Sequence, residues 1–382
     1  MSAVSKSIAI LGTRGLPATY SGFETSVEET ASRFVARGHR ARVYCRSHHY
    51  STRAETHRGA ELVFLPSIKT KHLDTFSHTL LSVLHVLFHR CDAVILYGLG
   101  NAAFIPLLRL FSIPVIAVLD GADWRRGKWG RLARLFLKGS RRIAVRSASR
   151  YVVDNRRLAE EYRRELGGDP VHIPYGAKLR TPVDPSVLER YGLTRRDYVI
   201  FVGRFVKEKN VEMLIESYMR LETSKKLVVV GGNPLDADYE RRIRAMGDSR
   251  ILFTGMVYGS DYESLLSEAL FYVSCSGLEG TSPSLLSAMA LNGFALVADI
   301  EENRETLRGS CATFAVDDGR ELRERLAYYL SRPDEVDRAR NETKRIVERH
   351  YDWERIAERY LEIIDGLREA RARSPFPENQ EN

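Results

Sequence analysis

Short apolar runs alternate with segments of helical periodicity along the whole chain, and this alternation is what most constrains its fold. It predicts parallel strands joined by helices, the α/β class. In the first half we expect strands at 7–11, 41–45, 61–65, 93–97, 114–119, 150–154 and 171–174. We expect helices to fill the gaps, notably at 22–37 and 155–166.

The alternation is interrupted at 175–185, where a glycine and two prolines predict a linker. Strands resume at 198–203, 226–231, 250–255, 271–275 and 294–299. A length of 382 residues also favours two cores. We therefore predict two doubly wound Rossmann-like domains around a central cleft, followed by a helix and a frayed tail. The boundaries are 1–180, 181–352, 353–370 and 371–382.

Several expected strands end in glycine, which lets backbone approach a ligand at the carboxyl edge of a sheet. These residues are Gly12, Gly98, Gly203, Gly231 and Gly255. The longest apolar runs, such as 80–88, are well short of the ~18 residues that span a bilayer. The first residues are too polar for a secretory signal, so a cytoplasmic location is expected.

The net charge of +8 is unevenly distributed. Residues 1–180 carry 29 Lys and Arg against 14 Asp and Glu, whereas residues 181–382 carry 29 against 36. Segment 125–150 holds ten basic residues and no acidic one. It combines the apolar residues Trp129, Leu132, Leu135 and Phe136 with the basic residues Arg131, Arg134 and Lys138. This predicts a helix on an anionic membrane surface. A solvated basic face is the alternative; nucleic acid is disfavoured because no aromatic binding motif accompanies the charge.

Residues 12–25, GTRGLPATYSGFET, place glycines between an expected strand and an expected helix. This arrangement suits an anion. The spacing fits neither the nicotinamide nor the ATP motif. The alternative is a turn that needs small residues for its backbone geometry.

The second half contains two loops whose residues are suited to ligand binding or catalysis. In 202–218 a strand ends at Gly203 and is followed by Arg204 and Lys209, two cations that suit a diphosphate. In 276–294, Glu279 precedes a helix that starts at Pro283 or Ser284. Surface salt bridges and a capped helix are the simpler readings of these segments.

Taken together, G-R-x4-K-N at 203–210 and E-G-T-S-P-S-L-L-x-A-M-A at 279–290 resemble the C-terminal domain of the family 4 retaining glycosyltransferases of the GT-B fold. The opening loop and DGADWRRGKW (120–129) resemble a bacterial subgroup that includes rhamnosyltransferases of surface-polysaccharide assembly. Segment YDWERIAERYLEII resembles the family's closing helix, which crosses back to the N-terminal domain.

The resemblance implies transfer of a sugar, such as rhamnose or another hexose, from a nucleotide-diphosphate donor to a saccharide or polyprenyl-linked acceptor. Asp120 and Glu279 would be catalytic, and no metal or other cofactor would be needed. The residues implied to contact the donor are Arg204, Lys209, Gly280, Thr281, Ser282, Ser287, Gly15 and Gly22. Arg14 and Glu24 would lie on the acceptor side, although Glu24 is also explained by a favourable place in the first helical turn.

Three positions depart from the family pattern. Ser287 replaces the second acid of Glu-x7-Glu, Asp120 stands where the wider family often has His, and Ser21 replaces a glycine. A serine cannot bind two ribose hydroxyls as a carboxylate does, a loss that a deoxyribose donor would tolerate better. The departures keep two alternatives open: a catalytically weak GT-B partner subunit and a nucleotide-sugar 2-epimerase.

Other polar residues suggest no site. Cys45, Cys91, Cys275 and Cys311 are too far apart in sequence for a metal motif and are expected to be free thiols. His48, His49 and His57 lack ligand spacing. Asp236 is expected to cap a helix that begins near Tyr239.

Overall fold

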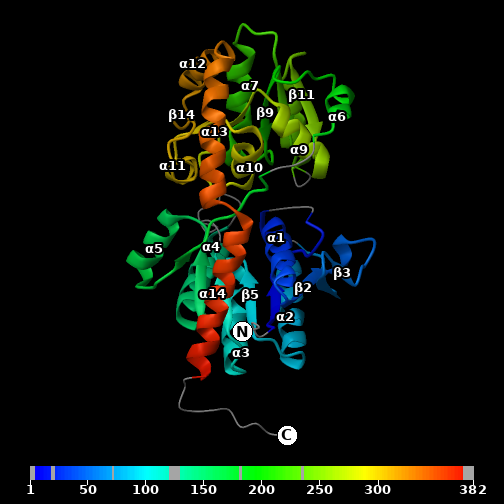
Figure 1. Cartoon of the computed structure of the whole chain (residues 1–382), viewed down its shortest axis with the longest axis vertical. Coiled ribbons are helices and arrows are strands. Elements are labelled where there is room, and N and C mark those ends of the chain that lie inside the picture. The colour runs from blue at the N-terminus through cyan, green and yellow to red at the C-terminus, as the bar shows by residue number, and fades with distance from the viewer. Residues whose placement is uncertain are drawn as a thin grey trace. The chain divides into compact units, whose positions relative to one another are not determined.

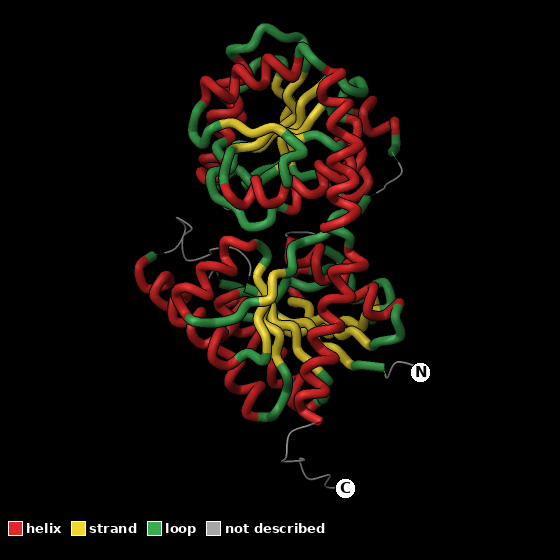
Figure 2. The backbone as a smooth tube through the Cα atoms, turned by 60° about the vertical axis from the view of Figure 1, so that its left-hand side comes forward, coloured by secondary structure: helices red, strands yellow, loops and turns green. Residues whose placement is uncertain are grey.

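The chain forms two compact units in the computed structural model, Met1–Pro174 with Trp353–Asn382, and Tyr175–Asp352 (Figure 1). The structure describes residues 5–18, 22–70, 73–119, 130–179, 183–233 and 236–372. Each unit contains a sheet covered by helices on both faces (Figure 2). The α/β class predicted from the alternating pattern is confirmed.

The sheet of the first unit has the order β3-β4-β2-β1-β5-β6-β7-β8. All neighbouring strands are parallel except β3 and β4. The strands are β1 (Ser7–Leu11), β2 (Arg40–Arg46), β3 (Thr56–His57), β4 (Ala60–Leu65), β5 (Ala93–Tyr97), β6 (Val115–Val118), β7 (Arg150–Val153) and β8 (Val171–His172). The central strands are apolar on both faces, as expected for a sheet covered on both sides.

The helices of this unit are α1 (Gly22–Ala36), α2 (Leu73–Phe88), α3 (Ile105–Leu110), α4 (Arg131–Ser147), α5 (Arg156–Leu166) and α14 (Trp353–Ala372). The chain thus returns to the first unit at its end. Ile356, Tyr360 and Ile364 of α14 are buried, and α14 packs against α1. Lys6 pairs with Asp365 at 2.8 Å, which ties the helix to the start of β1.

The sheet of the second unit is entirely parallel, with the order β11-β10-β9-β12-β13-β14. Its strands are β9 (Tyr198–Val202), β10 (Lys226–Val230), β11 (Ile251–Gly255), β12 (Phe271–Ser274), β13 (Ala295–Ala298) and β14 (Ala312–Phe314). Its helices are α6 (Pro185–Arg190), α7 (Val211–Met219), α8 (Ala237–Ala245), α9 (Gly259–Glu268), α10 (Pro283–Ser287), α11 (Glu301–Leu307), α12 (Gly319–Leu330) and α13 (Pro333–His350). A π-helix, Ala288–Asn292, continues α10 directly.

All twelve strands expected from the sequence are present, with ends shifted by no more than two residues. Two short strands, β3 and β14, were not expected. The first unit ends at Pro174, whereas the sequence suggested residue 180. The reason lies in Ala177, which forms a bridge with Asp352 and donates its N–H to the Tyr351 carbonyl at 2.8 Å, so this stretch belongs to the second unit.

A buried arginine, Arg340, connects several elements of the second unit by hydrogen bonds. The Arg340 guanidinium on α13 donates to the Leu270 carbonyl at 2.5 Å and to Asn292 Oδ1 at 2.8 Å. Asn292, fully buried, donates to the Ala269 carbonyl at 2.7 Å. These bonds connect α13 to the start of β12 and to the π-helix that follows α10.

We expect Arg340→Met to lower the free energy of unfolding by about 3 kcal/mol or more, because several buried carbonyl acceptors lose their donor together. Chemical denaturation followed by circular dichroism measures the change. Arg338→Met, on the exposed side of the same helix, is the control and should shift stability by less than about 0.5 kcal/mol. Equal effects of the two variants would contradict a structural role for the buried network.

Candidate active site

In both sheets the first strand of the unit is central: the strands that follow it in sequence lie on one side of it, and the later strands lie on the other side. The strand order therefore reverses between β9 and β12 in the second unit and between β1 and β5 in the first. Ligands of open α/β sheets bind beyond the carboxyl ends of the strands at such a reversal. The loops after β9, β12 and β1 are therefore the places to look for a site.

The loop after β9 carries two cations. Arg204 is exposed and forms no ion pair with any residue that the structure describes. Lys209 ends a 3-10 helix, Lys207–Lys209, and its ammonium group forms an ion pair with Glu279. Both side chains of this pair are largely shielded, with 16% and 12% of their surface exposed.

Hydrogen bonds fasten this loop to the loop after β12. Asn210 adopts a left-handed conformation and donates from Nδ2 to the Cys275 carbonyl at 3.2 Å and to Asp317 Oδ1 at 2.6 Å. The N–H of Gly277 donates to the Glu208 carbonyl at 3.1 Å. Lys209 and Glu279, 70 residues apart, are thereby held side by side.

The segment after Glu279 leads into α10 as predicted. Thr281 and Ser282 are buried, and α10 begins at Pro283. The Ser282 and Ser284 hydroxyls lie 3.2 Å apart, and Ser284 also bonds to the hydroxyl of Tyr272 at 3.1 Å. Gly280 is buried as well, and the Ser284–Tyr272 bond connects the first turn of α10 to β12.

Ser287, the position where the family pattern has an acid, lies near a residue that the sequence did not suggest. Its side chain partly opposes the effect of burial on the pKa of the Tyr262 phenol of α9. Burial nevertheless raises the pKa of Tyr262 to about 12, so the phenol is neutral at pH 7. Neither side chain brings a charge to position 287.

Glycine is required where the ends of β9 and β10 meet. Gly231 has φ +143°, and a Cβ there would lie 1.8 Å from the Gly203 carbonyl oxygen. No side chain fits at this point. The glycine that follows this strand in the sequence is therefore required by the close approach of two backbone segments.

In the first unit, the loop after β1 is packed against two neighbouring strands. A Cβ at Gly12 (φ +97°) would lie 2.2 Å from the Tyr97 carbonyl oxygen, and one at Gly15 (φ +115°) would lie 2.5 Å from Cys45 Sγ. The Arg14 carbonyl accepts from the Arg46 N–H at 2.8 Å. The alternative interpretation of these glycines as a tight turn is thus supported.

Glu24 holds the same loop. Its side chain is buried, and its Oε1 accepts the Arg14 N–H at 2.9 Å. Gly22 is the first residue of α1. Asp120, Ser21 and Trp129 lie outside the described residues, so the predicted role of Asp120 stays a prediction.

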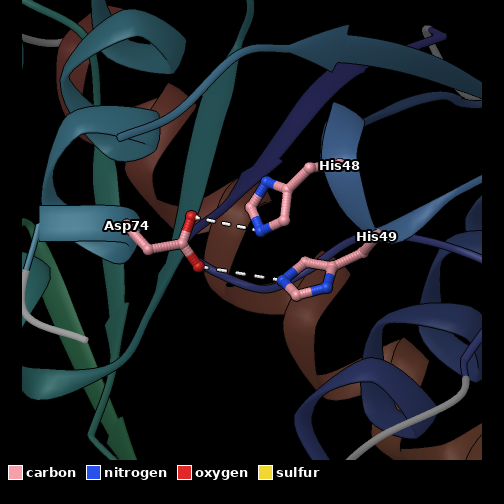
Figure 3. Close-up of side chains that lie close together, drawn as sticks. All are labelled: His48, His49 and Asp74. Atoms are coloured by element: carbon pink, nitrogen blue, oxygen red, sulfur yellow. Dashed lines mark ion pairs between the residues drawn. The ribbon is translucent and has the colours of Figure 1, made fainter. Parts of the chain in front are cut away.

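Two histidines without a predicted role converge on a carboxylate. Figure 3 shows His48 and His49, from the 3-10 helix after β2, pointing toward Asp74 at the start of α2. Their Nε2 atoms lie 3.6 and 3.7 Å from the Asp74 oxygens. Burial opposes ionisation of Asp74, but hydrogen bonds from Ser67 and Arg46 outweigh it and lower its pKa. Burial and the nearby Arg14 lower the pKa of His49 to about 4.

Sequence spacing missed this cluster because Asp74 follows His48 by 26 residues and no local pattern connects them. His57 instead bonds to Glu28 at 2.6 Å. Asp236 accepts the Tyr239 N–H at 3.0 Å, which confirms the predicted cap. The four cysteines are free.

The first unit also exposes a large apolar surface. On α4, Leu132, Leu135 and Phe136 are exposed beside Arg131, Arg134 and Lys138. The helix packs on the 3-10 helix Leu99–Phe104, as does α2. α2 adds a second exposed stripe, made of Leu73, Phe76, Leu80, Leu81, Leu84 and Phe88. Within the described part of the chain, no helix is both long and apolar enough to cross a membrane.

Comparisons with known proteins agree with this architecture. The chain is 29% identical over 213 residues to the alpha-D-kanosaminyltransferase of Streptomyces kanamyceticus, covering 51% of this chain and 55% of the relative. It is 26% identical over 195 residues to the putative teichuronic acid biosynthesis glycosyltransferase TuaC of Bacillus subtilis, covering 50% and 48%. The chain therefore spans about half the length of these relatives.

Among solved structures, Anabaena Alr3699/HepE in complex with UDP-glucose matches with a TM-score of 0.76 at 15% identity, covering 94% of this chain and 100% of that one. This likeness establishes the fold. The family described as glycosyl transferase 4-like domain matches residues 21–176, and the family described as glycosyl transferases group 1 matches residues 189–346. Two such domains in this order, on two parallel sheets, identify the chain as a member of the GT-B glycosyltransferase family.

Proposed function

We propose that the chain transfers a sugar from a nucleotide-diphosphate donor to a saccharide or polyprenyl-linked acceptor, with retention of anomeric configuration. The observation that carries the proposal is the group of Arg204, Lys209 and Glu279 at the strand reversal of the second unit. Arg204 is exposed on the same loop as Lys209, so it can accept a diphosphate without first losing a strong partner among the described residues.

Each residue of this group has a distinct part in the proposal. Arg204 and Lys209 bind the diphosphate oxygens by charge-assisted hydrogen bonds, and they stabilise the charge that develops on the leaving nucleotide diphosphate. Glu279 orients Lys209 and faces the donor sugar. The backbone of Gly280, Thr281 and Ser282 leads directly into α10, and the positive end of a helix dipole favours an anion.

We propose that this chemistry proceeds without a metal ion, because the two cations and the helix start supply the positive charge. The acceptor is assigned to the first unit, on the side of Arg14 and Glu24, and Gly15 and Gly22 are assigned to contact with the donor. Buried Glu24 acts there by holding Arg14, and Asp120 is the proposed catalytic partner on this side. Bound UDP-glucose in HepE supports a nucleotide-sugar donor.

The donor sugar is a finer part of the proposal. Ser287 offers one hydroxyl in place of a carboxylate, so it suits a nucleotide with few ribose contacts. A dTDP-linked deoxyhexose such as rhamnose meets that condition. The teichuronic acid assignment of TuaC supports a surface polysaccharide as product.

Removing either cation should weaken donor binding. We expect Arg204→Ala and Lys209→Ala each to raise the Kd of the preferred donor by about 10- to 100-fold, since a charge-assisted hydrogen bond contributes about 1.5–3 kcal/mol. Calorimetric titration with UDP-, GDP- and dTDP-sugars measures this. Lys207→Ala, in the same 3-10 turn, is the control. Unchanged affinity in both variants would place the donor elsewhere.

Glu279→Gln should lower the transfer rate by roughly 100-fold or more while the donor still binds, because a charge that faces the reacting sugar is lost. Transfer of labelled sugar to acceptor gives the rate, and exposed Glu216→Gln on α7 is the control. An unchanged rate would remove Glu279 from the mechanism. Donor binding without turnover in the unmodified chain would favour the partner subunit, and donor turnover without acceptor would favour the 2-epimerase.

We further propose that α4 places the first unit on an anionic membrane surface, at the cytoplasmic face where a polyprenyl-linked acceptor would be found. The exposed apolar residues of α4 would enter the headgroup region while its basic residues meet anionic lipid. The apolar stripe of α2 enlarges the surface available for contact.

Reversing Arg131, Arg134 and Lys138 to Glu should abolish cosedimentation with anionic liposomes. Each basic residue near such a surface contributes about 1 kcal/mol, so three reversals lower partitioning by at least about two orders of magnitude. The same reversal of exposed Arg338, Arg345 and Arg349 on α13 controls for net charge. Equal loss in both triple variants would reduce the effect to net charge, and persistent binding of the α4 variant would refute the proposal.

A further inference from the structure

We propose that His48, His49 and Asp74 form a binding site for a divalent transition-metal ion, with Zn²⁺ as the best match. The three residues belong to one unit and come from two neighbouring segments, the end of β2 and the start of α2. All three residues belong to the first unit, and the proposal is independent of the proposed transfer reaction.

The first argument is geometric. One ligand atom from each residue lies within 4.8 Å of the other two, and the two His–Asp separations are 3.6 and 3.7 Å. Ligands of tetrahedral Zn²⁺ at about 2.0–2.2 Å from the metal lie roughly 3.3 Å from one another. Side-chain movements of about 1 Å or less would close the group around an ion.

The second argument concerns protons. The Ser67 hydroxyl donates to Asp74 Oδ1 at 2.6 Å, so its lone pairs remain to accept from His48 Nδ1–H at 3.2 Å. In a neutral His48 this leaves the lone pair on Nε2, and that atom faces the same carboxylate. An ion held between them would have the imidazole nitrogen and the carboxylate oxygen as ligands.

The third argument concerns ligand type and charge. Two imidazole nitrogens and one carboxylate oxygen suit Zn²⁺, Co²⁺ or Ni²⁺, whereas Mg²⁺ and Ca²⁺ prefer oxygen ligands. Arg46 binds the other oxygen of Asp74 at 2.8 Å and opposes a second positive charge. Arg14 and Glu24 also lie within electrostatic range of Arg46 and act on it with opposite charges. Ser67 and Arg46 also orient the carboxylate as outer-shell partners do.

Such an ion would join the end of β2 to the start of α2. The Arg46 N–H bonds to the Arg14 carbonyl, so the loop after β1 would be held to the same point. Three protein ligands leave a fourth position open to water or to an oxygen of a bound molecule.

The test is titration of the full, chelator-treated chain with Zn²⁺ by calorimetry, and with Co²⁺ by visible absorption, in the absence of any donor. We expect one equivalent to bind, and His48→Gln, His49→Gln and Asp74→Asn each to weaken binding by about 100-fold or more, since even outer-shell changes cost 10- to 100-fold. Ser67→Ala should weaken it by about 10-fold.

His89→Gln is the matched control, because His89 stacks on His85 in another part of the unit and offers a competing histidine pair. It should leave the affinity unchanged. Absence of saturable binding would overturn the proposal, as would binding that survives His49→Gln or is lost in His89→Gln. Circular dichroism of each variant shows whether a loss reflects unfolding. The outcome does not depend on sugar transfer, so it can fail while the proposed function holds.

Discussion

The contact on which the second unit's site depends is the attachment of the loop after β9 to the loop after β12. β9 and β12 are neighbours because β10 and β11 lie on one side of β9, while β12, β13 and β14 lie on the other. The Gly277–Glu208 hydrogen bond and the bond from Asn210 to the Cys275 carbonyl then fix the loops to each other, and a second bond from Asn210 reaches Asp317 in the loop after β14. Lys209 and Glu279 are consequently paired before any ligand arrives, so little side-chain entropy remains to be lost on binding.

The same topology explains how much the sequence could predict. Strand positions were readable because each central strand is buried on both faces and so appears as a continuous apolar run. β3 and β14 were missed because they have two and three residues, too few to form a pattern. The site segments at 203–210 and 279–290 were found by motif, whereas their contact follows from strand order, which a single sequence does not reveal.

The contacts that were hardest to predict join residues that are far apart in the sequence. Asp74 approaches His48 because β2 and β4 are parallel neighbours, so that the segments after them leave the same edge of the sheet. The sequence suggested that Glu24 lies in the first turn of a helix, and it does, but its carboxylate also accepts a hydrogen bond from the Arg14 N–H. Tyr262, which lies near Ser287, belongs to α9, a helix with no motif of its own. In each case the side chain was visible in the sequence and its partner was not.

The charges of the candidate site in the second unit connect these observations. Glu279 neutralises Lys209, Ser287 adds no charge, and Arg204 remains as an exposed cation. An acid at position 287 would cancel that excess within the same unit. Under the proposed function, serine there adds no negative charge to oppose the attraction of Arg204 for a diphosphate. The same departure from the family pattern would weaken contact with the ribose, because a serine cannot bind two ribose hydroxyls as a carboxylate does.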